Sequence, residues 1–345
     1  GDNNVFMGNS AGGKTTTGLA NVMIGNYAGQ CHVSGSENVY ISHCAGRCMC
    51  DGSTNIAIGQ HALQGSSTVS NNTGSDNVSI GKNTGCVITG GSENVFVGKN
   101  AGQSVTSGSY NVLFGKGAGD AVTTGSNLIA IGCGALSAED ANTNGSIAIG
   151  KDALAVQNTT GLGNVAVGKD AGKAVTTGGE NTFLGYSAGS GLTGSSNVSI
   201  GTLTLTASSS GDSNVVVGQD AARNNTGSRN TIIGQAAGDA AGDGTDNVFV
   251  GKTAGGLVTD GDKNTILGTY AGDAVTTGCC NVIIGYNVDV ASAAGNNQFI
   301  IGIDSSKWIC GDSSYNIFDK DGNQLNGAAG FSPDSQENLY AGTNA

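Results

Sequence analysis

The chain has 345 residues, of which 61 are glycine, one is proline, 12% are charged and 5% are aromatic. Its formal charge of −12 argues against nucleic acid or an anionic membrane as a partner, because both require clustered lysine and arginine. No apolar run is long enough for membrane insertion, and the glycines lack the three-residue period of collagen.

A glycine recurs about every 17 residues, where it closes a phrase of the form Asn-Val-x-Ile-Gly. The spacing varies by at most one residue in either direction, except for a longer step between Gly59 and Gly81, and Ser42 fills one slot. The column contains Gly8, Gly25, Gly59, Gly81, Gly98, Gly115, Gly132, Gly150, Gly168, Gly185, Gly201, Gly218, Gly234, Gly251, Gly268, Gly285 and Gly302. A fixed short period is typical of a solenoid, whose repeats bury their apolar faces by stacking. We therefore predict an all-β fold, a parallel β-solenoid (β-roll) of about eighteen coils.

Branched aliphatic residues at the first and third positions of the phrase predict a short strand with both side chains facing the coil interior. The middle position should then face outward, yet it is apolar in many coils. These residues are Phe96, Leu113, Phe183, Val216, Ile232, Phe249, Ile266, Ile283 and Ile300. A strand that is apolar on both faces is buried on both faces. We therefore expect copies of the same chain to cover the outer face in a homo-oligomer.

Three other stations of the coil recur. Asparagine stands four residues before the closing glycine in 15 of 18 coils, and it either forms a hydrogen-bonded ladder along the coils or favours the turn into the strand. Alanine often follows three residues after the glycine, where we expect a tight interior corner. A Val-Thr-Thr-Gly phrase, as at Val122–Gly125, predicts a second short strand and a turn.

The repeat defines three segments: a solenoid shaft over residues 1–302, a non-repeat β cap or plug over residues 303–330, and the start of a further, truncated repeat block over residues 331–345. The phrase in the last segment breaks off, which indicates a fragment of a longer fibre. Within the cap, a Lys-Asp-Gly-Asn turn at residues 320–323 predicts a hairpin from Phe318 to Leu325.

Two interruptions of the repeat are expected in the shaft. The longer step after Gly59 predicts a loop between Gln64 and Asn72, and the stretch from Leu203 to Ser210 replaces the usual corner and predicts an irregular turn.

Nine cysteines, an odd number without a framework spacing, favour thiols that stay reduced. Cys31 and Cys48 are separated by one full repeat. Stacked coils would bring their Cα atoms to about 4.8 Å, which is within the range of a disulfide. Free thiols and a disulfide both remain open for this pair.

Metal-capable side chains gather in two successive repeats: His43, Cys44, Cys48, Cys50 and His61. Cys44 and His61 are also one full repeat apart and should stack, with Tyr27 one coil earlier. The spacing departs from the usual zinc motifs. We therefore predict ordinary column-filling side chains and no metal site, with a structural metal as the alternative.

Lysines recur directly after the closing glycine, at Lys82, Lys99, Lys116, Lys151, Lys169 and Lys252. A solvated stripe is the expected interpretation, and a stripe that binds anionic glycan is the alternative. The Gly-Gly-Lys-Thr run at 12–15 has a misplaced glycine and no following helix, so we predict no phosphate loop there. Three histidines supply little acid–base chemistry, and no catalytic constellation recurs, so we predict neither an enzyme nor a cofactor.

The phrases at Asn94–Gly102 and Asn281–Gly285 resemble the glycine-rich repeats of bacteriophage tail fibres, especially those of marine cyanophages. The stretch from Asn297 to Asn316 is similar to the segment that closes such repeat blocks. The phrase Ser146–Gly150 also resembles the head repeats of trimeric autotransporter adhesins, although those repeats are shorter. The resemblance covers residues 1–316 and implies trimerisation and attachment to a host surface. It supplies no binding residues.

These observations together predict a homotrimeric structural protein of a phage tail fibre or virion appendage, which is extracellular and presents a tip that binds a host receptor or surface glycan. One alternative is the passenger of a bacterial trimeric surface adhesin, located at the cell surface. Another is an ice-binding solenoid that uses paired threonines such as Thr123 and Thr124. A polysaccharide lyase is disfavoured because the sequence offers no basic, carboxylate-lined cleft.

Overall fold

The computed structural model describes residues 1–66, 72–138, 145–157, 163–207, 210–240, 242–311, 314, 316–325, 331–333 and 339–341, the last two stretches as backbone only. The chain divides into two compact units, Gly1–Ser190 (the N-terminal unit) and Gly191–Ala345 (the C-terminal unit). Every regular element in the described residues is a β-strand. Within those residues, no helix has the length and hydropathy needed to cross a bilayer.

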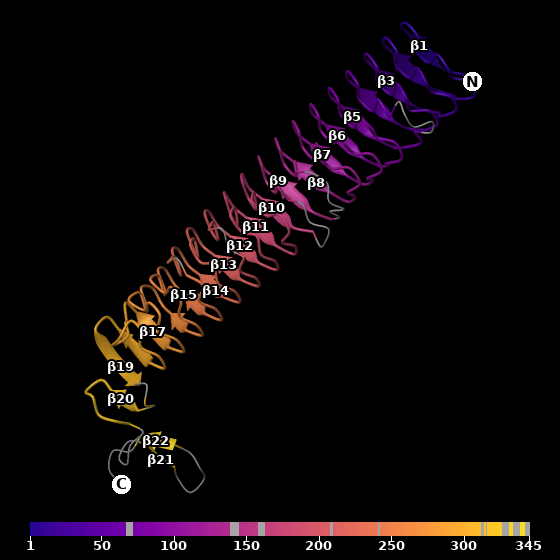
Figure 1. The fold of residues 1–345 in the computed structure, drawn as a ribbon. Helices are drawn as coiled ribbons and strands as arrows, with labels where there is room; N and C mark the ends of the chain where they lie inside the picture. Colours follow the sequence, from indigo (N-terminus) through magenta and orange to yellow (C-terminus); the bar gives the residue numbers. More distant parts are fainter. Residues whose placement is uncertain are drawn as a thin grey trace. The chain divides into compact units, whose positions relative to one another are not determined.

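The N-terminal unit is a parallel β-solenoid, as predicted. Each strand from β1 to β10 pairs in register with the strand one coil later, so Val95 lies beside Val112 and Phe96 beside Leu113 (Figure 1). The strands are β1 (Val5–Met7), β2 (Val22–Ile24), β3 (Val39–Ile41), β4 (Ile56–Ile58), β5 (Val78–Ile80), β6 (Val95–Val97), β7 (Val112–Phe114), β8 (Ile129–Ile131), β9 (Ile147–Ile149), β10 (Val165–Val167) and β11 (Thr182–Leu184).

The C-terminal unit continues the same parallel pattern and then changes to antiparallel pairing. Its parallel strands are β12 (Val198–Ile200), β13 (Val215–Val217), β14 (Thr231–Ile233), β15 (Val248–Val250), β16 (Thr265–Leu267), β17 (Val282–Tyr286) and β18 (Phe299–Ile303). β19 (Ser306–Gly311) then pairs antiparallel with β18, and β20 (Ile317–Asp319) with β19. β21 (Phe331–Pro333) and β22 (Leu339–Ala341) pair with each other. The three segments predicted from the sequence, with boundaries at residues 302 and 330, rest on the repeat pattern and stay a prediction.

The strands face the opposite way from the sequence prediction. The middle residue points into the coil: Phe96 is fully buried, whereas Val95 before it is 36% exposed. Side chains alternate along a strand, and the buried Asn94 therefore shares the inner face with Phe96. The expectation that the first and third positions fill the core and the middle position faces outward was wrong, because the asparagine on the middle residue's face is buried through its ladder of hydrogen bonds.

The buried asparagines form a hydrogen-bonded ladder along the coils, one of the two interpretations that the sequence allowed for them. The backbone N–H of Asn38 donates to Oδ1 of Asn21 at 2.9 Å, and Nδ2 of Asn38 donates to the same oxygen at 3.0 Å. That amide also donates to the carbonyl oxygen of Gly52 in the next coil at 2.9 Å. The same pattern recurs along both units, so the ladder amides are satisfied by the coils on either side of them.

The closing glycines are required by the backbone. Gly59 has φ of +135°, and a Cβ there would lie 2.5 Å from the carbonyl oxygen of Gly81 in the next coil. Ser42 is the exception at this station, with φ of 119°. The alanine corner is confirmed, because Ala28 and Ala45 are fully buried.

The second short strand was a wrong prediction. The stretch that contains Val122–Gly125 runs through bends and has no strand. Thr106 donates to the carbonyl oxygen of Thr123 both from its backbone N–H, at 2.8 Å, and from its hydroxyl, at 3.1 Å. These bonds hold adjacent coils together there without the alternating ladder that defines a strand.

The interruptions lie partly outside the described residues. Asn72 ends the loop predicted after Gln64, and its Nδ2 donates to the carbonyl oxygen of Cys48 at 2.6 Å, but residues 67–71 lie outside the description. Leu205 in the irregular stretch is fully buried, and residues 208–209 again lie outside. The hairpin from Phe318 to Leu325 is confirmed by an antiparallel bridge between Phe318 and Gln324.

Candidate functional site: the outer strip and the corner side chains

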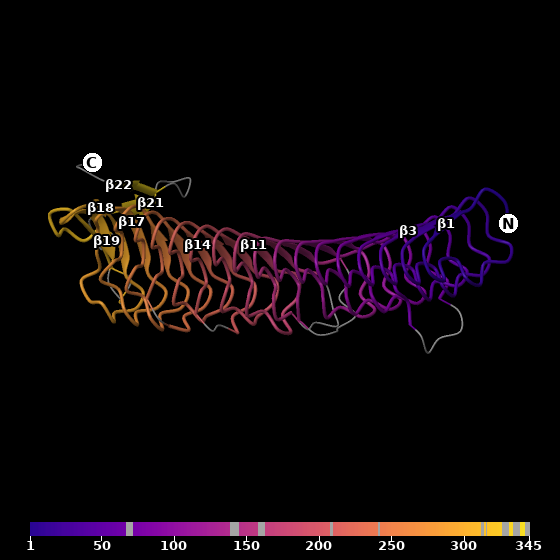
Figure 2. The ribbon, with the colours of Figure 1, turned by 90° about the horizontal axis from the view of Figure 1, so that it is seen from above.

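Two aliphatic columns run along the outer face of the sheet in the N-terminal unit. They consist of the first and third residues of strands β1–β11, which we call the outer strip. Its exposed members, between 36% and 63% exposed, are Val5, Met7, Ile56, Ile58, Ile80, Val95, Val112, Phe114, Ile131 and Leu184, and the remaining members are half-buried. In Figure 2 the strands of each unit lie on one side of its coils, with turns closing the other side. Eleven strands at about 4.8 Å spacing make this strip roughly 50 Å long.

The outer strip carries no charge. Thr182 is its one polar residue, and every other member is aliphatic, aromatic or methionine. The corresponding positions of the C-terminal unit, on strands β12–β18, are also uncharged, with Thr231 and Thr265 as the polar members. Parallel sheets are ordinarily covered on both faces, and a monomer rarely exposes an apolar patch beyond a few hundred Å². The strip is therefore the surface of this unit best suited to an apolar partner.

The lysine column has two kinds of surroundings. Lys169 and Lys173 pair with Asp170 at 3.2 and 3.0 Å, and Lys169 lies 5.1 Å from the ring centre of Tyr186. Burial alone would raise the pKa of Asp170, but hydrogen bonds from the two lysines outweigh it and hold that pKa below its usual value. Among the described residues, the column members before Lys151 form no ion pair. The solvated stripe and the glycan-binding stripe both stay predictions.

The first threonine of two pairs takes part in coil stacking. The hydroxyl of Thr16 donates to the carbonyl oxygen of Val33 at 3.2 Å, and that of Thr276 donates to Ala293 at 3.3 Å. An ice-binding face needs free hydroxyls in flat ranks, whereas these hydroxyls are directed along the stack.

The sequence allowed either free thiols or a disulfide for one pair of cysteines, and the structure has free thiols. Cys31 and Cys48 are both unbonded to other cysteines. Burial, and then the neighbouring Cys31 thiol, raises the pKa of Cys48 to about 11. A thiol with this pKa is a poor nucleophile near neutral pH.

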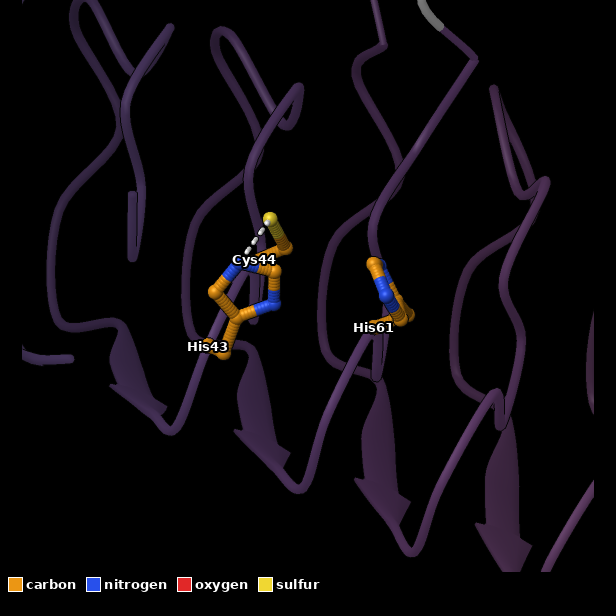
Figure 3. Close-up of side chains that lie close together, drawn as sticks. All are labelled: His43, Cys44 and His61. Atoms are coloured by element: carbon orange, nitrogen blue, oxygen red, sulfur yellow. Dashed lines mark hydrogen bonds between the residues drawn. The ribbon is translucent and has the colours of Figure 1, made fainter. Parts of the chain in front are cut away.

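The structure brings three of the metal-capable residues together: His43, Cys44 and His61 (Figure 3). One ligand atom from each lies within 4.8 Å of the other two. His43 follows β3 and is exposed, Cys44 beside it is buried, and His61 follows β4 in the next coil. Cys48 and Cys50 are not part of this group. The repeat period predicted that Cys44 and His61 would stack, and it did not predict that His43 would join them.

The comparisons with known proteins identify no relative. No protein-family model, curated protein or solved structure matches the chain. The resemblance to tail-fibre and adhesin repeats therefore stays a prediction from the sequence.

Proposed function

We propose that this chain is a structural segment of a phage tail fibre or a comparable virion appendage, in which copies of the chain pack through their outer strips. The observation that carries the proposal is the outer strip itself. It is uncharged, half-exposed and continuous over successive coils of one unit.

A second copy of the same chain is the partner that fits this strip best. The coils repeat at about 4.8 Å, and a surface with the same repeat can match every coil without losing register. An uncharged, continuous apolar surface is typical of obligate interfaces rather than transient ones. The number of copies, three, comes from the resemblance and not from the geometry.

The role that follows is mechanical. Asparagine side chains and backbone bonds connect each coil to the next, so load along the stack is shared by many hydrogen bonds. Such a segment would space and present a receptor-binding tip on the outside of a virion. The passenger of a bacterial surface adhesin would use the same device, and a membrane anchor in the same protein would select that alternative.

Native mass spectrometry of the 345-residue chain tests the association. We expect a trimer that persists at micromolar concentration. The double variant Val95→Glu/Val112→Glu places two carboxylates in the strip and should give monomers, because their burial against a neighbour is unfavourable.

Ser107→Glu is the matched control, since Ser107 is exposed and lies outside the strip. Circular dichroism shows whether each variant keeps its β structure. A wild-type chain that is folded and monomeric at these concentrations would refute the proposed packing.

A further inference from the structure

The cluster of His43, Cys44 and His61 has the chemistry and the separations of a metal site. We propose that these three side chains bind one Zn²⁺ ion in the N-terminal unit, independently of whether the chain is a fibre protein. Two imidazoles and one thiol form a nitrogen–sulfur ligand set, which favours zinc over calcium or magnesium, since those ions prefer oxygen ligands.

The separations fit tetrahedral zinc. Sγ of Cys44 and Nε2 of His43 lie 3.6 Å apart. Zn–S bonds of about 2.3 Å and Zn–N bonds of about 2.0–2.1 Å place two tetrahedral ligands roughly 3.6 Å apart. The ring centres of His43 and His61 lie 5.3 Å apart with planes at 89°, so the two rings meet edge to face. Since the three ligand atoms already lie within 4.8 Å of one another, a shift of about 1 Å closes the site.

His61 supplies the second observation that points to a ligand. Its Nδ1 atom is buried and has no hydrogen-bond partner among the described residues. A buried polar atom without a partner has a free-energy cost, and a bound cation would satisfy a ring nitrogen of this kind. The unpartnered ring nitrogen thus belongs to one of the three residues of the cluster.

The backbone holds the ligands in place before any metal binds. Cys44 and His61 occupy the same station in successive coils, with φ of 57° and 59°. The N–H of His61 donates to the carbonyl oxygen of His43 at 3.1 Å, and the N–H of Cys44 donates to the carbonyl oxygen of Asn26 at 3.0 Å. The ligands therefore lie on a hydrogen-bonded scaffold rather than on a free loop.

The surroundings allow a fourth ligand from solvent. His43 is exposed, so the coordination position that faces outward is open to water. On its other side His43 contacts Tyr27 edge to face at 6.3 Å, and Arg47 lies over that tyrosine at 5.6 Å from the ring centre. Nε of Arg47 donates to Oε1 of Gln30 at 3.0 Å.

The binding step balances without a redox partner. A Zn–S bond replaces the S–H bond of Cys44, and the proton leaves to solvent. Both imidazoles bind as neutral rings through a nitrogen lone pair.

Ser42, which precedes His43, occupies the station where the other coils have glycine, and its φ of 119° is strained for a residue with a side chain.

Cobalt(II) is the probe that tests the site, because a thiolate on Co²⁺ gives a charge-transfer band in the near ultraviolet. The full chain, reduced and stripped with a chelator, should bind one Co²⁺ per chain with this band, and Zn²⁺ should displace it. Cys44→Ser should abolish the band, and His61→Asn and His43→Asn should each weaken binding by at least about 100-fold. The His43 variant alters an exposed side chain, so its result does not depend on refolding of the core.

Cys48→Ser and the exposed Cys133→Ser are the controls, and both should leave the Co²⁺ spectrum unchanged. A band that survives Cys44→Ser or disappears in Cys48→Ser would place the metal elsewhere and overturn the proposal. So would the absence of Co²⁺ binding at 100-fold molar excess. The oligomeric state is measured separately, so failure of the metal site leaves the proposed packing untouched.

Discussion

Two groups of coils in the N-terminal unit share one backbone and carry different chemistry. The histidine coils (residues 38–65, with β3 and β4) have His43, Cys44 and His61 after their strands, whereas the lysine coils (residues 77–119, with β5 to β7) have lysines there. The station of His61 is occupied by Asn100 in the lysine coils, with φ of 61°. Its N–H donates to the carbonyl oxygen of Lys82 at 2.9 Å, the same bond that His61 makes.

The comparison shows which residues this fold constrains. Bonds between coils fix the backbone at the corner, and asparagine tolerates its left-handed conformation well. Histidine also tolerates it, and tyrosine occupies the same station at Tyr27, so the backbone does not restrict this position to one residue type. The coils therefore accept a change of surface chemistry without a change of fold.

The largest expected effect is the same in both groups, because both depend on the inward middle residue. Phe96→Ala in the lysine coils and Tyr40→Ala in the histidine coils each remove a fully buried ring. We expect each to lower the free energy of unfolding by about 3–5 kcal/mol, measured by urea denaturation. A small loss at only one of the two positions would show that the groups differ in their cores as well.

The asparagine ladder gives the next effect. Asn38→Ala leaves the N–H of Asn55 and the carbonyl oxygen of Gly52 without their side-chain partner. We expect a loss of about 2 kcal/mol in unfolding free energy, and an equal loss for Asn94→Ala in the lysine coils. Equal unfolding midpoints for wild type and variants would contradict the ladder.

Substitutions at the station of the closing glycine should have opposite effects on stability in the two groups of coils. Ser42→Gly relieves a strained backbone and should stabilise the histidine coils by about 1 kcal/mol. Gly98 has a similar φ of 122° in the lysine coils, and Gly98→Ser should destabilise them by at least as much. Thermal unfolding of the two variants checks this, and the same sign for both would argue against strain at Ser42.

The smallest effect concerns stacked carboxylates in the C-terminal unit. Burial, and then the hydrogen bond and charge of Asp289, raises the pKa of Asp273 to about 6. A carboxyl whose pKa is raised by folding stays protonated longer in the folded state, so stability falls as pH rises from about 4 to about 6 and levels off above that. Thermal unfolding midpoints across this pH range should show the fall. It should diminish in Asp289→Asn and persist in the control Asp260→Asn, which alters an exposed carboxyl.

The period and the buried alanine corner followed from the sequence. The spacing of the closing glycines determined the coil, and Ala28 and Ala45 marked its corner. Which face of each strand points inward was not predicted correctly, because the aliphatic residues at the first and third positions were assigned to the core. Asn94 lies two residues before Phe96 and shares its face, so only the burial of the asparagine ladder, one of two interpretations of the sequence, determines which face is inward.

The corner cluster was predictable only in part. Separation by one full repeat implies that Cys44 and His61 stack, because equal stations of adjacent coils are neighbours. His43 stands one station earlier than Cys44 and His61, so the repeat period alone does not bring its side chain to them.

The asparagine ladder has a direction, and this bears on how such a chain can change in length. Each side chain accepts from the asparagine one coil later and donates to the glycine carbonyl of that same coil. A duplicated repeat inserted between two others would thus find the donors and acceptors it needs on either side. Tandem duplication or loss of whole repeats can lengthen or shorten the protein during evolution without redesign of any junction.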